Sequence, residues 1–185
     1  INALFYDIEK EEVVDLVGGI ADIQSNSIRT VGRAQERFEE DPLRKLRALR
    51  FAGRTGGKIE KNTAEAIISD NSLEGISAER IRDEFKKSVE TAKSPKKYLE
   101  LVEEFKLWPI MFPTVYVNKD FINSKNWFVQ LATLFRVNEN DQIKSQMNKL
   151  TFSNLEIDAI IFLKSILDLK PENVFELSKR RDSVG

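Results

Sequence analysis

The hydrophobic pattern of the chain changes near residue 32. Before that point β-forming residues and glycine dominate, in short runs at 3–6, 13–17 and 27–31. Such runs predict the edge of a β-sheet. From Gln35 onward apolar residues recur at helical spacing, which predicts helices of about 10 to 18 residues. The expected fold is mainly α, with helices that follow a short β segment.

Several helices have recognisable starts. Ser77 is placed as the N-cap of a helix over 78–92, and Ser94 precedes Pro95 at the start of the next. Ser153 and Glu156 have the spacing of a capping box for a helix that runs to Leu167. A further helix is expected over 126–137. Prolines 109 and 113 predict a break and a loop before it.

Composition narrows the possible chemistry. The 185 residues are 41% hydrophobic and 32% charged, as in one or two small globular domains. The chain has no cysteine and no histidine, which excludes disulfides, zinc fingers, a thiol nucleophile and an imidazole base. The formal net charge is −1, and no apolar run has the roughly 18 residues that span a bilayer. A cytoplasmic protein without a membrane partner is expected.

The charge is not evenly distributed. Asp41 precedes Pro42 at an expected helix start. At about 100° per residue, Arg47, Arg54 and Arg50 fall roughly 60°, 80° and 120° from Arg44, on one face of that helix. The opposite face carries Leu46, Leu49, Ala52 and Gly53. Residues 29–54 hold eight basic and four acidic residues, a local excess of four positive charges.

Each of these features has a plain structural interpretation. The arginine face could be a solvated surface with ion pairs, although a guanidinium suits bidentate contacts to phosphates or bases better than lysine does. Glu40 and Asp41 could serve only as a helix cap. The pair Gly18-Gly19 alone indicates a tight turn, and the glycine-rich phosphate-loop patterns are absent.

Taken together and in order, the motifs resemble those of a known family. They are the Ile1-Asn2-Ala3-Leu4 start, the Asp15 to Ile23 stretch, Ile28 to Gly32, Glu40-Asp41-Pro42-Leu43-Arg44 through Arg54, and Ile76 to Ile81. This succession closely resembles the bacterial tRNA nucleotidyltransferase (CCA-adding enzyme) and poly(A) polymerase family over residues 1 to about 113. The resemblance implies that 1–32 are the last strands of a nucleotidyltransferase head, 33–92 a neck with the nucleotide-reading helix, and 93–185 a helical body with a short tail.

The resemblance also implies roles for individual residues. Asp41 and Arg44 match the pair that contacts the incoming base, and Glu40 matches the residue that orients the arginine. Arg47 and Arg50 are expected to contact the triphosphate or the RNA backbone, and Asn2 to approach the nucleotide sugar. Asp15, Gly18, Gly19 and Asp22 match a mobile segment between head and neck, which implies a hinge.

The chain also lacks one motif that the family uses for catalysis. The family uses paired aspartates in a D-x-D arrangement to hold Mg²⁺, and no such pair is present here. Asp7, Asp15 and Asp22 lack that spacing. We therefore expect no catalytic residue and no metal ligand in this chain. Activity is expected to require an N-terminal catalytic part, on the same polypeptide or on a separate chain.

The resemblance implies addition of CMP and AMP to the tRNA 3′ end, with CTP and ATP as substrates. This chain would supply nucleotide selection and RNA support. Poly(A) addition or a partial CC- or A-adding activity is an alternative within the same chemistry. A non-catalytic helical module that binds RNA or a protein is a second alternative.

Overall fold

The computed structural model describes residues 3–120 and 122–167, and it is mainly helical. The expected fold class is therefore confirmed. In chain order the elements are β1 (Leu4–Asp7), β2 (Glu12–Asp15), α1 (Gly19–Gln24), β3 (Ser27–Ile28), α2 (Ala34–Glu40), α3 (Leu43–Thr55), β4 (Lys58–Ile59), α4 (Lys61–Ser69), α5 (Ala78–Thr91), α6 (Pro95–Glu104), α7 (Trp108–Met111), α8 (Trp127–Leu134), α9 (Asn140–Lys149) and α10 (Asn154–Leu167).

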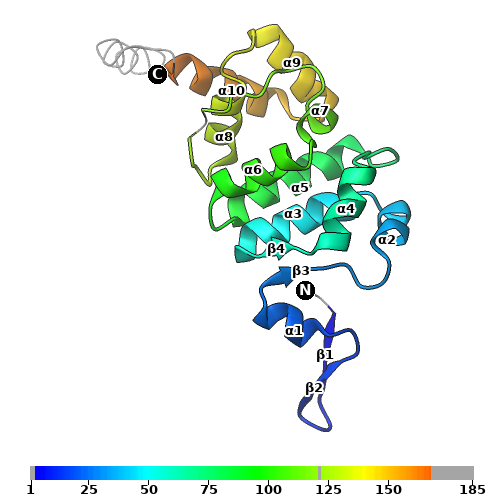
Figure 1. Cartoon of the computed structure of the whole chain (residues 1–185). Helices are drawn as coiled ribbons and strands as arrows, with labels where there is room; N and C mark the ends of the chain where they lie inside the picture. Colours follow the sequence, from blue (N-terminus) through cyan, green and yellow to red (C-terminus); the bar gives the residue numbers. More distant parts are fainter. Residues whose placement is uncertain (1–2, 121, 168–185) are drawn as a thin grey trace.

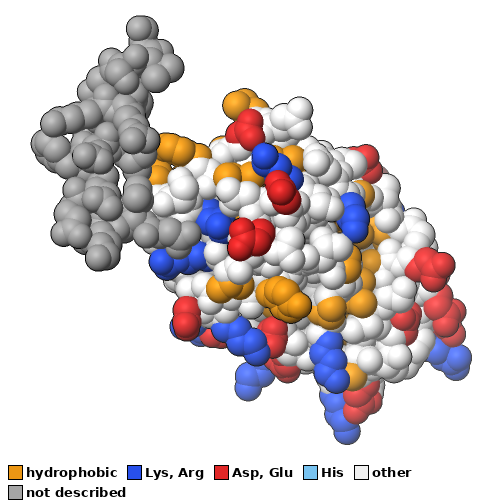
Figure 2. Space-filling view, turned by 90° about the horizontal axis from the view of Figure 1, so that it is seen from above, with side chains coloured by type: hydrophobic (Ala, Val, Ile, Leu, Met, Phe, Trp, Pro, Cys, Tyr) orange, Lys and Arg blue, Asp and Glu red, His pale blue; other side chains and the backbone are white. Residues whose placement is uncertain are grey.

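The elements follow one another along an elongated molecule. The β1–β2 hairpin projects at one end, α2 to α6 form the middle, and α7 to α10 form the other end (Figure 1). Seen from the α9 and α10 end, basic and acidic side chains are interspersed over the described surface (Figure 2). On this face the mixture of signs agrees with the balanced net charge of the chain. No helix within the described ranges is both long enough and apolar enough to cross a membrane.

The first 32 residues differ in part from the expected sheet edge. β1 and β2 form an antiparallel hairpin in which Leu4 faces Asp15. The expected strand over 27–31 is reduced to the two residues of β3, which pair in parallel with β4, beyond α3. Between the expected strands, Gly19–Gln24 form the helix α1, which the sequence pattern did not predict. The reason is local, since the carboxylate of Asp15 accepts the N–H groups of Gly19 and Ile20, each at 2.9 Å.

Most expected helix starts are confirmed. The Ser77 hydroxyl accepts a hydrogen bond from the N–H of Arg80 at the start of α5, and Ser94 caps α6. Ser153 and Glu156 make both hydrogen bonds of the capping box that opens α10. The expected helix over 126–137 is shorter, because α8 ends at Leu134. α4 and α9 are helices that were not among those expected from the sequence.

The core runs without a break from the middle of the molecule to its far end. Leu46 and Leu49 of α3 are fully buried, as expected for the side opposite the arginines. Aromatic rings continue the core: Phe85 of α5 lies 5.4 Å from Phe112, just after α7, and Phe112 lies 5.1 Å from Phe135, just after α8, between ring centroids. α3 packs on α5 and α6 through its apolar side. Its opposite side faces solvent.

Candidate functional site

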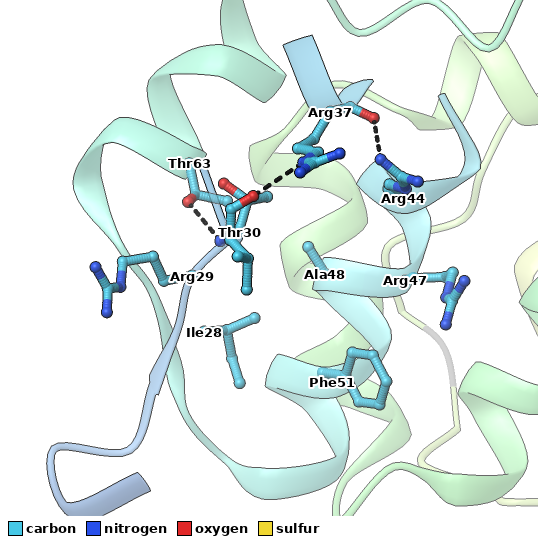
Figure 3. Close-up of a pocket in the computed structure, with 10 residues that line it drawn as sticks. Ile28, Arg29, Thr30, Arg37, Arg44, Arg47, Ala48, Phe51 and Thr63 are labelled. Atoms are coloured by element: carbon cyan, nitrogen blue, oxygen red, sulfur yellow. Dashed lines mark hydrogen bonds between the residues drawn. The ribbon is translucent and has the colours of Figure 1, made fainter. Parts of the chain in front are cut away.

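A cavity of about 260 Å³ lies between the segment after β3, helix α2 and the first turns of α3. Its apolar lining comes from Ile28, Val31, Ala48 and Phe51, and its polar lining from Arg29, Thr30, Arg37, Arg44, Arg47 and Thr63. Figure 3 shows Arg37, Arg44 and Arg47 on the same side of this space. The cavity therefore combines an apolar surface with a concentration of guanidinium groups.

Glu40 connects two of these arginines. Its carboxylate accepts hydrogen bonds from Nη1 of Arg44 at 2.6 Å and from Nη1 of Arg37 at 3.0 Å. The hydrogen bonds from Arg44 and then Arg37 lower the pKa of Glu40 below its usual value. Nη1 of Arg44 also donates to the carbonyl of Arg37 at 3.0 Å (Figure 3). Within the described residues Nε and Nη2 of Arg44 have no partner, so they remain available as donors.

Asp41 lies beside this network but has a different partner. Both of its carboxylate oxygens contact Nη2 of Arg80, at 3.1 and 3.2 Å, and one also accepts the N–H of Leu43 at 3.3 Å. The N–H of Arg44 donates to the backbone carbonyl of Asp41 at 3.0 Å, but among the described residues no hydrogen bond joins their side chains. The structure thus brings Glu40 and Arg44 together, while Asp41 is held from α5.

Arg47 and Arg50 have different environments. Arg47 lines the cavity, and in the part of the chain that the structure describes its guanidinium has no ion-pair or hydrogen-bond partner. Arg50 is 5% exposed, and its Nε donates to Glu84 of α5 at 2.5 Å. α5 covers the edge of the arginine face that Arg50 occupies, and the expected contact of Arg50 with phosphate or RNA stays a prediction. Arg54, farther along α3, is exposed.

Several lining residues were not expected. Arg29 and Arg37 contribute to the local charge excess, and Arg29 also lies in the Ile28 to Gly32 motif, but neither was assigned a role. Thr63 lines the cavity from the start of α4, and its Oγ1 accepts the N–H of Thr30 at 3.3 Å (Figure 3). Arg80 lies in the Ile76 to Ile81 motif but was assigned no role, because only the packing of α5 on α3 brings it to Asp41.

The predicted hinge residues form one local structure. Gly18 has a left-handed backbone, with φ of 77°, and a Cβ on Gly19 would lie 3.0 Å from the Leu4 side chain. Backbone hydrogen bonds from Ile20 and Gly19 lower the pKa of Asp15. Asp22 pairs with Arg29 at 3.0 Å. These contacts explain the two glycines, and hinge motion itself stays a prediction. Asn2 lies outside the described residues.

Carboxylates in the described ranges do not gather into a metal site. No group of three or more Asp or Glu side chains there could hold a metal ion. Asp7, Asp15 and Asp22, which the sequence analysis does not treat as ligands, each engage in local contacts, with backbone N–H groups for the first two and Arg29 for the third.

Comparison with protein families gives two matches. Residues 1–29 match the family described as the poly A polymerase head domain. Residues 57–117 match the family described as the probable RNA and SrmB-binding site of polymerase A. The two matches flank the cavity region and occur in the order that the motifs indicate.

The similar proteins include both poly(A) polymerases and CCA-adding enzymes. The chain is 36% identical over 116 residues to poly(A) polymerase I of Salmonella typhi, a match that covers 62% of this chain and 25% of the relative. It is 41% identical over 104 residues to the CCA-adding enzyme of Bacillus velezensis, covering 56% of this chain and 26% of the relative. The matched segment thus spans about a quarter of these curated relatives.

Solved structures share the fold. The crystal structure of the Bacillus stearothermophilus CCA-adding enzyme in complex with CTP aligns with a TM-score of 0.71 and 26% identity, covering 92% of this chain and 46% of that one. A tRNA-processing enzyme with CTP aligns with the same TM-score over 96% of this chain and 54% of that one, at 22% identity. By its ordered motifs, its two family matches and this shared fold, the chain belongs to the tRNA nucleotidyltransferase (CCA-adding enzyme) and poly(A) polymerase family.

Proposed function

We propose that this chain is the nucleotide-reading and RNA-supporting part of an enzyme that adds CMP and AMP to the tRNA 3′ end without a nucleic acid template. The observation that carries the proposal is the 2.6 Å contact between Glu40 and Arg44 at the cavity. It fixes one edge of the guanidinium and leaves Nε and Nη2 as donors with a defined direction.

The donor and acceptor pattern of the bases supports this role. Cytosine and adenine each present an amino donor beside a ring-nitrogen acceptor. A carboxylate oxygen of Asp41 beside the donors of Arg44 would satisfy both bases. Uracil and guanine present the reverse order, which would leave polar groups unpaired at the site, and such mismatches are strongly disfavoured.

The rest of the cavity suits the remainder of a nucleotide. Arg37 and Arg47 bring positive charge toward the triphosphate, and Arg47 has no competing partner among the described residues. Ile28, Ala48 and Phe51 offer an apolar surface for the base or sugar. Mg²⁺ supplies charge neutralisation and activates the 3′ hydroxyl in this class of reaction. The described residues do not assemble a site for it, and their proposed part is base reading and phosphate contact.

Two alternatives have support of their own. Curated relatives include poly(A) polymerases as well as CCA-adding enzymes, and a poly(A) or A-adding enzyme would favour ATP over CTP. The match of residues 57–117 to a probable RNA and SrmB-binding region favours a second alternative, a module that binds RNA or a protein. Such a module would show no triphosphate preference.

Nucleotide binding tests these possibilities. The thermal stability of the purified 185-residue chain would be measured with CTP, ATP, UTP or GTP. Base reading predicts stabilisation by CTP and ATP, lost in Asp41→Ala and retained in Glu39→Ala, which removes an exposed carboxylate two positions away. Equal stabilisation by all four nucleotides, or by none, would contradict the proposal.

A further inference from the structure

The carboxylate of Asp41 is held from a distant part of the chain. Arg80, near the start of α5, directs Nη2 at both carboxylate oxygens, at 3.1 and 3.2 Å. The two residues are 39 positions apart in the sequence. We propose that Arg80 is a specificity-determining positioning residue, which orients Asp41 so that it discriminates CTP and ATP from UTP and GTP. This inference rests on the proposed function.

Counting acceptor sites shows what the contact leaves open. A carboxylate offers about four lone-pair directions, two on each oxygen. On Asp41, Oδ1 accepts from Arg80 and from the N–H of Leu43, whereas Oδ2 accepts from Arg80 and from no other described residue. One direction on Oδ2 therefore remains for a donor from outside. The amino group of cytosine or adenine can fill it, while the carbonyl oxygen at the equivalent place in uracil or guanine would meet another acceptor.

Arg80 can impose this orientation because its helix is firmly anchored. Ser77 caps α5 on the N–H of Arg80 itself. Farther along α5, Phe85 is 1% exposed in the core, and Glu84 pairs with Arg50 of α3 at 2.5 Å. α5 is thus attached to the same helix that carries Arg44. The Arg80 side chain is about half exposed, so it adds little to the core, and its loss is expected to leave the fold intact.

Asp41 has few other restraints. Its backbone, just past the end of α2, is extended, and the Leu43 contact of 3.3 Å involves one oxygen. Without Arg80 the carboxylate can rotate about its side-chain bonds and present either oxygen, or water, to the base. The triphosphate contacts would remain, since Arg37 and Arg47 lie on other elements of the cavity. Loss of Arg80 should therefore change the choice among bases more than the affinity for phosphate.

The experiment measures dissociation constants of the 185-residue chain for CTP and UTP by equilibrium dialysis. In Arg80→Ala the UTP to CTP ratio of dissociation constants should fall about tenfold, the effect of one misplaced charge-assisted hydrogen bond. Arg80→Lys, which keeps the charge but not the planar fork, should restore part of the ratio. Arg54→Ala removes an exposed arginine of α3 and should leave the ratio unchanged. Circular dichroism would verify that each variant is folded.

A double mutant separates positioning from a general effect. If Arg80 acts through Asp41, the ratio in Asp41→Ala/Arg80→Ala should equal that in Asp41→Ala alone. An unchanged ratio in folded Arg80→Ala would overturn this inference and leave base reading by Asp41 standing. A further fall in the double mutant would show that Arg80 does not act through Asp41, which also overturns it. Absence of any preference in the unmodified chain would instead sink the proposed function.

Discussion

Arg50 of α3 and Glu84 of α5 form an ion pair inside the protein, with Nε and Oε1 2.5 Å apart and side chains only 6% and 10% exposed. The Arg50 guanidinium also lies 4.4 Å from the centroid of the Phe51 ring. Two helices that shape the candidate site are therefore joined by charges that water barely reaches. Removing one partner leaves the other charged and buried, which is far more costly than removing both.

This pair should dominate the stability of the α3–α5 contact. Glu84→Gln is expected to lower the free energy of unfolding by about 3 kcal/mol or more, since Arg50 then keeps its charge without a counter-ion. The double variant Arg50→Met/Glu84→Leu should lose much less. Urea denaturation followed by circular dichroism measures both. Arg54→Ala, at an exposed position of the same helix, is the control, and a Glu84→Gln variant as stable as this control would contradict the prediction.

The burial of Arg50 could not be predicted from the sequence. Helical periodicity predicts which side of α3 is buried, because Leu46 and Leu49 share a face at fixed angles. Periodicity also groups Arg50 with Arg44 and Arg47. It does not indicate where a second helix packs, and α5 covers the edge of the arginine face that Arg50 occupies. Whether a charged residue at the boundary between two faces is exposed or buried therefore depends on the tertiary packing.

Local signals predict the helix starts well. The caps at Ser77, Ser94 and Ser153 depend on atoms within three residues of each other, so sequence spacing is sufficient. The pairing of β3 with β4 joins segments about thirty residues apart. Each strand has only two residues, and neither sequence indicates which segment it pairs with. α1 was missed for a similar reason, because its start depends on the side chain of Asp15 folding back over the glycines.

The contacts of the candidate site also fall into two kinds, those between neighbouring residues and those that depend on the tertiary fold. Glu40 and Arg44 are four residues apart, and their contact spans a single turn of chain between α2 and α3. A motif alone can indicate that pair. The Asp41 contact with Arg80 and the Thr63 contribution to the cavity require the tertiary fold. Their roles in nucleotide reading are proposals that only binding measurements test.

Lys45 gives a prediction about pH. Its side chain is fully buried, and its Nζ contacts Asp70 at 2.8 Å and the Ser72 carbonyl at 2.9 Å. The hydrogen bond from Lys45 lowers the pKa of Asp70 below its ordinary value. Because the folded pKa is depressed, the contact stabilises the protein above about pH 4, and this contribution is lost as the pH falls through the folded value.

Asp70→Asn tests the sign of this effect. The Asp70 carboxylate is 61% exposed, and solvent screening limits the expected loss of unfolding free energy at pH 7 to about 1 kcal/mol. Urea titrations of both proteins from pH 7 to pH 3 should show the difference shrinking toward the acid end. A difference that is constant with pH would mean that the charge of Asp70 is not what stabilises Lys45.

Asn138 secures the long segment before α8. Its Oδ1 accepts the N–H of Tyr116 and its Nδ2 donates to the Tyr116 carbonyl, both at 2.7 Å. Asn138 is 3% exposed, so Asn138→Ala would leave the partly buried N–H and carbonyl of Tyr116 without these partners. We expect a loss of about 2 to 3 kcal/mol in unfolding free energy. Thermal unfolding measures it, and Asn148→Ala, at an exposed position of α9, should have little effect.

Arg47 and Arg54 provide a matched pair for the phosphate contact. Both lie on the outer side of α3, but only Arg47 lines the cavity, and no ion pair in the described structure involves either one. Arg47→Ala should weaken CTP and UTP binding by a similar factor, roughly tenfold for one charged phosphate contact, and should reduce the salt dependence of binding. Arg54→Ala should do neither. Equilibrium dialysis at two salt concentrations measures both variants. If the two variants had equal effects, the nucleotide would be attracted by the overall positive charge of the helix, and the cavity would not select a phosphate position.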